Sequence, residues 1–212
     1  ICIPVGKDSM SMQTRWQEDN VDKAVTSPMS LIISAFAPVS DVRETLTPEF
    51  DMSEDSVLLL VDLGKNRLGG SIVAQCYGEL GESVADVDSA RQLKAFFELM
   101  QSDELRGKVK AYHDRSDGGV FVSLVEMAFA SRCGVEIEVD ADGGLIEKLF
   151  NEELGAVLQV ALADQQEIIN AFGAQAINCE PVARPTADQL VVIKKAGETV
   201  FSAQRSDLQQ RW

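Results

Sequence analysis

The feature that most constrains the fold of this chain is the apolar run VLLLVDL at residues 57–63. A strand with one face in water alternates apolar and polar residues, whereas a strand buried on both faces is apolar along most of its length. The run therefore predicts a strand covered on both sides, and it requires a chain long enough to supply two covering layers. A chain of 212 residues is long enough to supply both layers.

Strand and helix patterns are mixed along the chain, which predicts an α/β (α+β) fold with no repeats. Strands are expected at residues 1–5, 30–39, 57–63, 109–112, 135–139, 156–162 and 177–182, with a hairpin of 190–193 and 199–201. Helices are expected at residues 71–80, 89–105, 119–132, 145–150 and 164–172, and a loop at 17–28. Residues 45–54, which contain Pro48, are the expected domain boundary.

The charge balance disfavours two classes of partner. The chain has 34 acidic and 19 basic residues, a formal net charge of −15, with the acidic residues spread along its length. Such a surface repels the phosphates of nucleic acids and of anionic lipids, so neither nucleic acid nor a membrane is an expected partner. A phosphate bound here needs a cation or backbone donors, and Mg²⁺ is the first candidate.

The cysteines and the apolar segments of the sequence indicate the cellular compartment of the protein. The four cysteines are isolated from one another, without a C-x-x-C pair, which fits a reduced compartment. No run of about 18 apolar residues and no export signal is visible, so we expect a cytoplasmic protein. The chain begins at Ile with what reads as a strand already in progress, and we expect it to be part of something longer.

The strongest chemical signal is the sequence HDRSDGG, here called the acidic loop, between an expected strand and an expected helix. It consists of His113, Asp114, Arg115, Ser116, Asp117, Gly118 and Gly119. Carboxylates can hold a hydrated divalent cation, small glycines admit a ligand, and amides at a helix start face an anion. The alternative is an ordinary helix cap, in which Asp117 or Ser116 accepts hydrogen bonds from the first free amides.

His113 is the only histidine of the chain. It could act as a general acid or base. The alternative, which we favour, is a structural side chain packed at the end of a buried strand beside Tyr112.

Residues 64–71 (GKNRLGGS), here called the glycine turn, follow the apolar strand and precede a helix, as a phosphate-binding P-loop does. Gly64 and Gly69 have the Walker A separation, but Gly70 stands where the lysine is required. The turn either approaches a ligand closely or is only a tight connection.

Two further polar segments are ambiguous. In residues 6–9, Lys7 could meet a substrate phosphate and Asp8 lies beside it, but a surface ion pair explains them equally well. Residues 151–155 (NEELG) either lend carboxylates to a site or form a solvated helix end.

Four motifs occur together and in order: IPVGKDSMSM at residues 3–12, RLGGS at 67–71, HDRSDGG at 113–119 and FNEELGAV at 150–157. Together they closely resemble the phosphoribosylformylglycinamidine synthase family, most of all its large single-chain bacterial type. Each motif alone would be weak, but the resemblance extends over nearly the whole chain.

The resemblance implies a fold, a division into domains and an activity. The synthetase region of this family is similar to a duplicated aminoimidazole ribonucleotide synthetase. By this resemblance, residues 1–50 would be the tail of the second N-terminal, barrel-forming domain. Residues 51–212 would be the second C-terminal α/β domain, a mixed sheet with flanking helices. The family converts formylglycinamide ribonucleotide, ATP and glutamine to formylglycinamidine ribonucleotide in purine biosynthesis, using Mg²⁺.

The resemblance also implies the roles of two residues. In the large enzymes this loop belongs to a nucleotide site, understood as structural, where ADP stays bound with Mg²⁺. Carried over, Asp114 is a metal ligand and Ser116 contacts the nucleotide. The resemblance gives no equally firm role to Lys7, Gly69, Gly70 or Glu153. The weaker candidates for site residues are Lys7, Asp8, His113, Asp117, Gly118, Gly69 and Gly70.

Parts of the family pattern are absent from this sequence. It has no glutaminase cysteine in a glycine-flanked elbow, and the catalytic first half is missing as well. We therefore expect an ATP-dependent C–N ligase fragment that is inactive alone and whose partners are small-molecule nucleotides and the remaining domains, including the glutaminase. The alternative is a non-catalytic interaction or dimerisation module, because unpaired strands seek partners.

Overall fold

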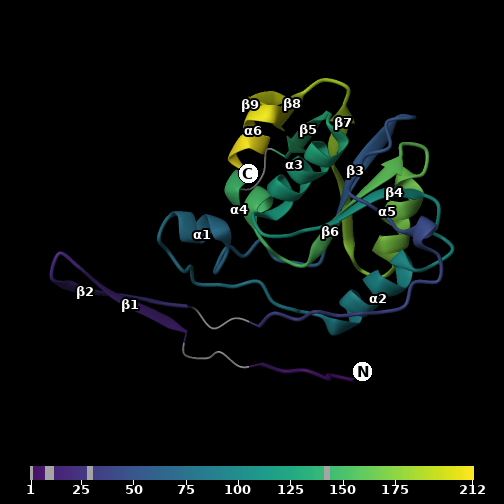
Figure 1. Ribbon diagram of the computed structural model, residues 1–212. Coiled ribbons are helices and arrows are strands. Elements are labelled where there is room, and N and C mark those ends of the chain that lie inside the picture. Colours follow the sequence, from purple (N-terminus) through teal and green to yellow (C-terminus); the bar gives the residue numbers. More distant parts are fainter. Residues whose placement is uncertain (1, 8–11, 28–30, 141–143) are drawn as a thin grey trace. The chain divides into compact units, whose positions relative to one another are not determined.

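The computed structural model describes residues 2–7, 12–27, 31–140 and 144–212. The chain divides into two compact units, Ile1–Arg43 and Glu44–Trp212, and each is described by itself. Figure 1 shows the larger unit as a sheet with helices packed against it.

The first unit contains a two-stranded antiparallel hairpin. Strand β1 (Gln13–Glu18) pairs with β2 (Val21–Thr26) through the two-residue turn Asp19-Asn20. Both turn residues have positive φ, 53° and 63°, the conformation that joins two strands without splaying them. The expected loop at residues 17–28 was wrong over this hairpin, because the turn chemistry of Asp-Asn was not recognised.

Two strands expected in the first unit are not formed. The described residues 2–5 and 31–39 have no regular secondary structure, and their apolar side chains are exposed, among them Ile3, Leu31 and Phe36. A strand needs a neighbouring strand to bond its backbone. No described part of the chain supplies one here, so the β-rich composition of these segments does not produce a ladder.

The second unit is built on a seven-stranded mixed sheet in the order β4-β6-β3-β7-β5-β8-β9. Its pairs are antiparallel except β5 with β8, which are parallel. The strands are β3 (Ser56–Asp62), β4 (Val109–Asp114), β5 (Gly134–Val139), β6 (Gly155–Ala161), β7 (Asn178–Thr186), β8 (Leu190–Lys195) and β9 (Glu198–Gln204). The expected mixed sheet with flanking helices is confirmed.

The helices follow the predicted order with corrected lengths. They are α1 (Ile72–Cys76), α2 (Ala90–Met100), α3 (Gly119–Ser131), α4 (Leu145–Phe150), α5 (Gln165–Ala174) and α6 (Arg205–Arg211), with a 3₁₀ turn at Val42–Glu44. Helix α1 is shorter than expected, and the chain then turns at Gly78, whose φ is +70°. Helix α6 was not predicted. None of the described helices is long and apolar enough to cross a lipid bilayer.

Strand β3 is buried on both faces, as its apolar run predicted, because its residues alternate between two cores. Leu58 and Leu60 enter a core completed by α3 and α4. Leu59 and its neighbours on the opposite face enter a second core completed by α2 and α5. In Figure 1, β3 runs through the middle of the second unit with β6 beside it. The two cores fix the sheet, and with it the strand ends that carry the polar loops.

We predict that Leu59→Ala lowers the free energy of unfolding by about 2–5 kcal/mol, because removing the buried Leu59 side chain leaves a cavity that the neighbouring side chains cannot fill. Leu59 is 0% exposed, whereas Leu80 in the same unit is 75% exposed. The control Leu80→Ala should change the stability by no more than about 0.5 kcal/mol. Urea unfolding of both variants measures the difference, and equal losses would contradict the assigned core.

Candidate functional site

The acidic loop connects the end of β4 to the start of α3 and opens to solvent. It borders an open depression of about 700 Å³. The depression is lined by Asp114, Arg115, Ser116, Asp117, Glu126, Leu154 and Gly155. Asp114 and Asp117 are exposed and Ser116 is half-buried, so these oxygen-bearing side chains can be reached by a ligand.

The helix-cap alternative for the acidic loop is wrong. Residue Gly118 is the N-cap of α3, and no side chain of the loop caps the helix. The Ser116 hydroxyl instead donates to the carbonyl oxygen of Asp114 at 3.1 Å. The carboxylate of Asp117 therefore does not cap helix α3.

One oxygen of Asp114 is held by its neighbour Tyr112. The phenol hydroxyl of Tyr112 donates to the Asp114 carboxylate. Burial of the phenol, together with this carboxylate, raises the pKa of Tyr112. The tyrosine therefore stays a neutral hydrogen-bond donor at physiological pH and orients the carboxylate at the edge of the depression.

His113 is engaged on both sides of its ring. Its Nε2 lies 3.1 Å from Glu126 Oε2, and its Nδ1 lies 2.6 Å from the carbonyl oxygen of Asp114. The other oxygen of Glu126 accepts from the indole of Trp212 at 2.8 Å. These contacts support the structural interpretation of His113 over a role as general acid or base.

Arg115 points inward, and its side chain is 0% exposed. It donates to the carbonyl oxygens of Glu153 at 2.6 Å and Leu154 at 2.8 Å, and to the carboxylate of Asp62 at 2.5 Å. Its Nη1 is buried without a hydrogen-bond partner among the described residues. Arg115 therefore links the acidic loop to the last residue of β3 and to the segment just before β6.

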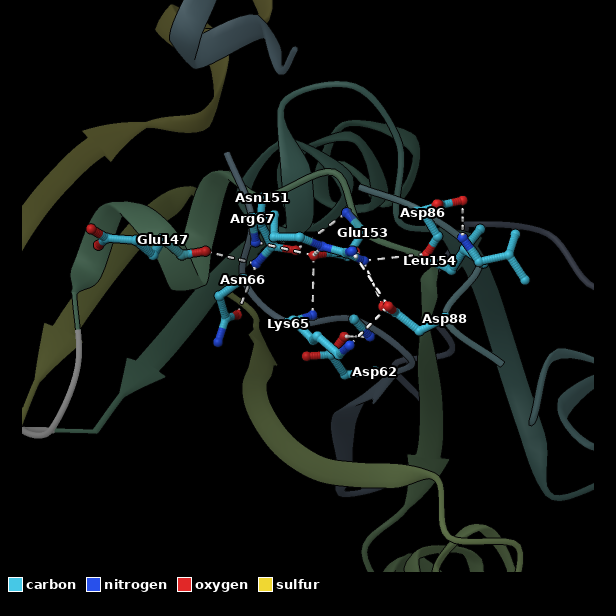
Figure 2. Close-up of polar contacts among 12 residues, drawn as sticks. Asp62, Lys65, Asn66, Arg67, Asp86, Asp88, Glu147, Asn151, Glu153 and Leu154 are labelled. Atoms are coloured by element: carbon cyan, nitrogen blue, oxygen red, sulfur yellow. Dashed lines mark hydrogen bonds and ion pairs between the residues drawn. The ribbon is translucent and has the colours of Figure 1, made fainter. Parts of the chain in front are cut away.

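The glycine turn is held by a buried carboxylate, that of Glu153. Figure 2 shows this side chain facing Arg67 and Lys65. Glu153 is 0% exposed and accepts from both backbone amides, at 3.1 Å for Lys65 and 3.0 Å for Arg67. It also accepts from the guanidinium of Arg67, at 2.6 and 2.7 Å. Asp88 pairs with both cations from the outside, at 2.8 and 2.7 Å.

The electrostatics of Glu153 follow from these contacts. Burial alone raises the pKa of a carboxyl group, but the hydrogen bonds from Arg67 and from the amides of Arg67 and Lys65 outweigh it and leave the pKa of Glu153 lowered. The same pair raises the pKa of Arg67. The solvated helix end, one interpretation of residues 151–155, is therefore wrong at Glu153.

The structure brings three of the four motifs together. The glycine turn and the acidic loop both contact the segment Asn151–Gly155, which joins α4 to β6. Gly69 lies against the backbone of Ser83, where a Cβ would come within 2.4 Å of the carbonyl oxygen, and Gly70 has a φ of +74°. Both glycines thus serve the tight connection, one of the two interpretations considered for them.

The fourth motif belongs to the first unit. Lys7 is exposed in the first unit, and Asp8 lies outside the described residues. The predictions for Lys7 and Asp8 remain predictions.

The sequence did not predict which buried residues hold the two loops of the site in place. Arg67, Arg115 and Glu153 were each in a recognised motif, yet their roles were not assigned. The one available signal was that each of these charged residues lies in a short segment beside a predicted buried strand, where a charge that becomes buried must be paired.

The donor set of the depression suits magnesium only in part. Asp114, Asp117 and Ser116 offer the oxygen ligands that Mg²⁺ prefers, and Mg²⁺ commonly uses one or two carboxylates together with waters and phosphates. In the described ranges, no group of three or more His, Cys, Asp or Glu side chains is arranged to hold a metal ion. These residues therefore fit one side of a magnesium–phosphate group.

Comparison with known families defines the class of protein. Residues 53–195 match the family described as AIR synthase related protein, C-terminal domain, and the chain belongs to this family. Residues 1–38 match a second family, the FGAR-AT PurM_N-like domain. The resemblance drawn from the four motifs is confirmed by these two matches.

Solved structures share the fold. PurL from Thermotoga maritima complexed with FGAR superposes with a TM-score of 0.65 at 13% identity, over 88% of this chain and 30% of that one. The same PurL complexed with ATP gives 0.60 at 13% identity, over 87% and 28%. HypE from E. coli, a hydrogenase maturation protein, gives 0.50 at 22% identity, over 70% and 49%. The chain thus spans less than a third of the PurL structures it matches.

We predict that Glu153→Gln destabilises the chain by about 2 kcal/mol at pH 7, because Arg67 loses its buried counter-charge. Since the folded pKa of Glu153 is lowered, its stabilisation is complete above the unfolded pKa of about 4.3 and is lost as the pH falls through the folded pKa. The difference between wild type and variant should therefore shrink in acid.

Urea unfolding between pH 7 and pH 3 tests this expectation. Glu98→Gln, which alters an exposed carboxylate on α2, is the control and should match wild type throughout. A difference between wild type and Glu153→Gln that stays constant over this range would contradict the assigned ion pair.

Proposed function

We propose that this chain works as the C-terminal part of the synthetase region of a phosphoribosylformylglycinamidine synthase, a cytoplasmic enzyme of purine biosynthesis. That enzyme is an ATP-dependent C–N ligase that takes nitrogen from glutamine. The single observation that carries the proposal is the acidic loop, whose exposed Asp114 and half-buried Ser116 border an open depression at the end of β4.

In this proposal residues 1–50 are the tail of an N-terminal, barrel-forming domain and residues 51–212 are the following α/β domain. The compact units divide at Arg43, and the two family matches cover residues 1–38 and 53–195, which supports a boundary in this region. The exposed apolar residues near Ile3 and Leu31 fit strands that are completed by other parts of the barrel.

The chain contributes one side of a site for Mg²⁺ and a nucleotide, ATP or ADP. PurL from T. maritima has been solved with ATP and with ADP, which supports nucleotide binding in this fold. Asp114 would be a ligand of Mg²⁺ and Ser116 would contact the nucleotide. Mg²⁺, when bound, supplies the positive charge that lets phosphates approach a protein with a net charge of −15.

The other residues around the depression have supporting roles. Asp117 borders the same depression, and His113 contacts Glu126, which also borders it. No catalytic residue is assigned to this chain. Its partners are the remaining domains of the same enzyme, including the glutaminase that supplies ammonia, and without them it has no synthetase activity.

Calorimetric titration with MgADP tests the proposal. The 212-residue chain alone should bind weakly or undetectably, because only one side of the site is present. In the intact enzyme Asp114→Ala should lower retained ADP and thermal stability more than the rate of the chemical step, whereas Glu98→Ala, an exposed change on α2, should leave both as in wild type.

Two results would count against this function. Submicromolar binding of MgADP by the chain alone would show that the site is not shared with other polypeptide. Normal ADP content and normal thermal stability of Asp114→Ala in the intact enzyme would remove Asp114 from the site.

A second candidate function is a non-catalytic interaction or dimerisation module. The observation that favours it is the exposure of apolar side chains in the first unit, where Ile3, Leu31, Ile32 and Phe36 are 84%, 85%, 89% and 96% exposed. Two copies could bury these segments against each other.

Size-exclusion chromatography with light scattering distinguishes the two functions. Under the main proposal the 212-residue chain does not form a defined dimer through these segments, and its mass stays that of a monomer as concentration rises. The control is Phe97→Asp, which alters an exposed side chain of α2. A concentration-dependent dimer that Phe36→Asp abolishes and Phe97→Asp leaves intact would favour the second function.

A further inference from the structure

One carboxylate oxygen joins the two loops of the site. Glu152 Oε1 accepts a hydrogen bond from the amide of Ile72 at 2.9 Å and from the amide of Gly118 at 2.8 Å. Ile72 is the first residue of α1, directly after the glycine turn, and Gly118 is the N-cap of α3 in the acidic loop. The two amides are 46 residues apart in sequence, and neither has a capping side chain from its own loop that replaces this bond.

The segment that carries Glu152 is also the surface against which both loops pack. A Cβ on Gly119 would come within 2.6 Å of the Leu149 carbonyl oxygen and 2.7 Å of that of Asn151. A Cβ on Gly64 would come within 2.2 Å of the Glu153 Cβ. Both loops therefore pack closely against the segment that carries Glu152, each at a glycine that leaves no room for a side chain.

The loop conformation at Gly118 and Gly119 needs such external support. Both residues have left-handed backbones, with φ of +82° and +71°. Glycine adopts this conformation without steric cost, but the first amides of any helix have no acceptor within the helix itself. Glu152 satisfies the first of them with a charged acceptor, which forms a stronger bond than a neutral one.

We infer that Glu152 is a positioning residue that couples the glycine turn to the acidic loop and thereby fixes the direction in which Asp114 and Ser116 face the depression. Glu152 is half-buried and touches no proposed ligand, so it acts through the Gly118 amide. Its neighbour Glu153 holds only the glycine turn by its side chain, so the two adjacent carboxylates have different tasks.

The consequence for ligand binding rests on the proposed function. If the glycine turn is displaced, the Ile72 amide leaves Glu152, and the carboxylate is free to leave Gly118 as well. The conformation of the acidic loop thus depends on a turn that does not itself border the depression. The two loops are thus coupled through one acceptor oxygen that two backbone amides share, and the coupling is measurable without any ligand.

Amide hydrogen exchange measured by NMR on the 212-residue chain tests the inference. In Glu152→Ala, exchange at both Ile72 and Gly118 should rise about tenfold, because a hydrogen bond to a charged group is lost at each. In Glu152→Gln, which keeps an oxygen acceptor at the same reach, both should rise together by only about threefold. Exchange at Leu59, which follows global unfolding, should change less than at either.

The control Glu98→Ala removes an exposed carboxylate from α2 and should change neither amide. A rise at only one of the two amides in either variant, no rise at either, or equal rises in the Ala and Gln variants would overturn the inference. Glu152→Gln decides the question alone if Glu152→Ala does not fold.

A second measurement separates this inference from the proposed function. In the intact enzyme, Glu152→Ala should lower MgADP affinity about tenfold, and Glu152→Gln should restore most of it. If exchange at the two amides behaves as expected while MgADP affinity is unchanged, the coupling stands and the proposed nucleotide site fails.

Discussion

The buried ion pair between Glu153 and Arg67 is the interaction on which the rest of the site depends. A carboxylate that is 0% exposed is tolerable only when its oxygens are fully occupied, and here two amides and a guanidinium occupy them. Because these donors all come from the glycine turn, pairing the charge also fixes the turn. The start of β6 is fixed in the same way, since Arg115 binds the carbonyl oxygens of Glu153 and Leu154. The two apolar cores fix the strands, and the paired buried charges fix the loops that leave their ends.

Much of the second unit could be predicted from its sequence because its signals are local. The apolar run at β3 required burial on both faces, and the HDRSDGG motif stood between a strand and a helix as expected. Helix α6 was missed because its seven residues, RSDLQQR, carry one apolar position and form no apolar stripe of their own. The first unit was predicted poorly, since whether a β-rich segment becomes a strand depends on a partner that its own residues do not specify.

The sequence predicted the exposed residues of the candidate site but not the buried residues that hold them in place. Asp114, Ser116 and Asp117 were singled out because oxygen-rich loops at strand ends have a recognisable chemistry, and they do border one depression. The roles of Arg115, Glu152 and Glu153 depend on contacts 30 to 90 residues away in sequence, which no local pattern encodes. Family resemblance named the loop, and the geometry assigns the residues that hold it.

The position of β3 in the sheet has a consequence for biosynthesis. Its two neighbours, β6 and β7, begin at residues 155 and 178, which is 99 and 122 residues after the start of β3 at residue 56. During translation the apolar strand therefore emerges long before the strands that cover its edges, and contacts so distant in sequence form slowly. Until then VLLLVDL presents apolar side chains and two unpaired strand edges to the solvent, which makes it an aggregation-prone segment during synthesis.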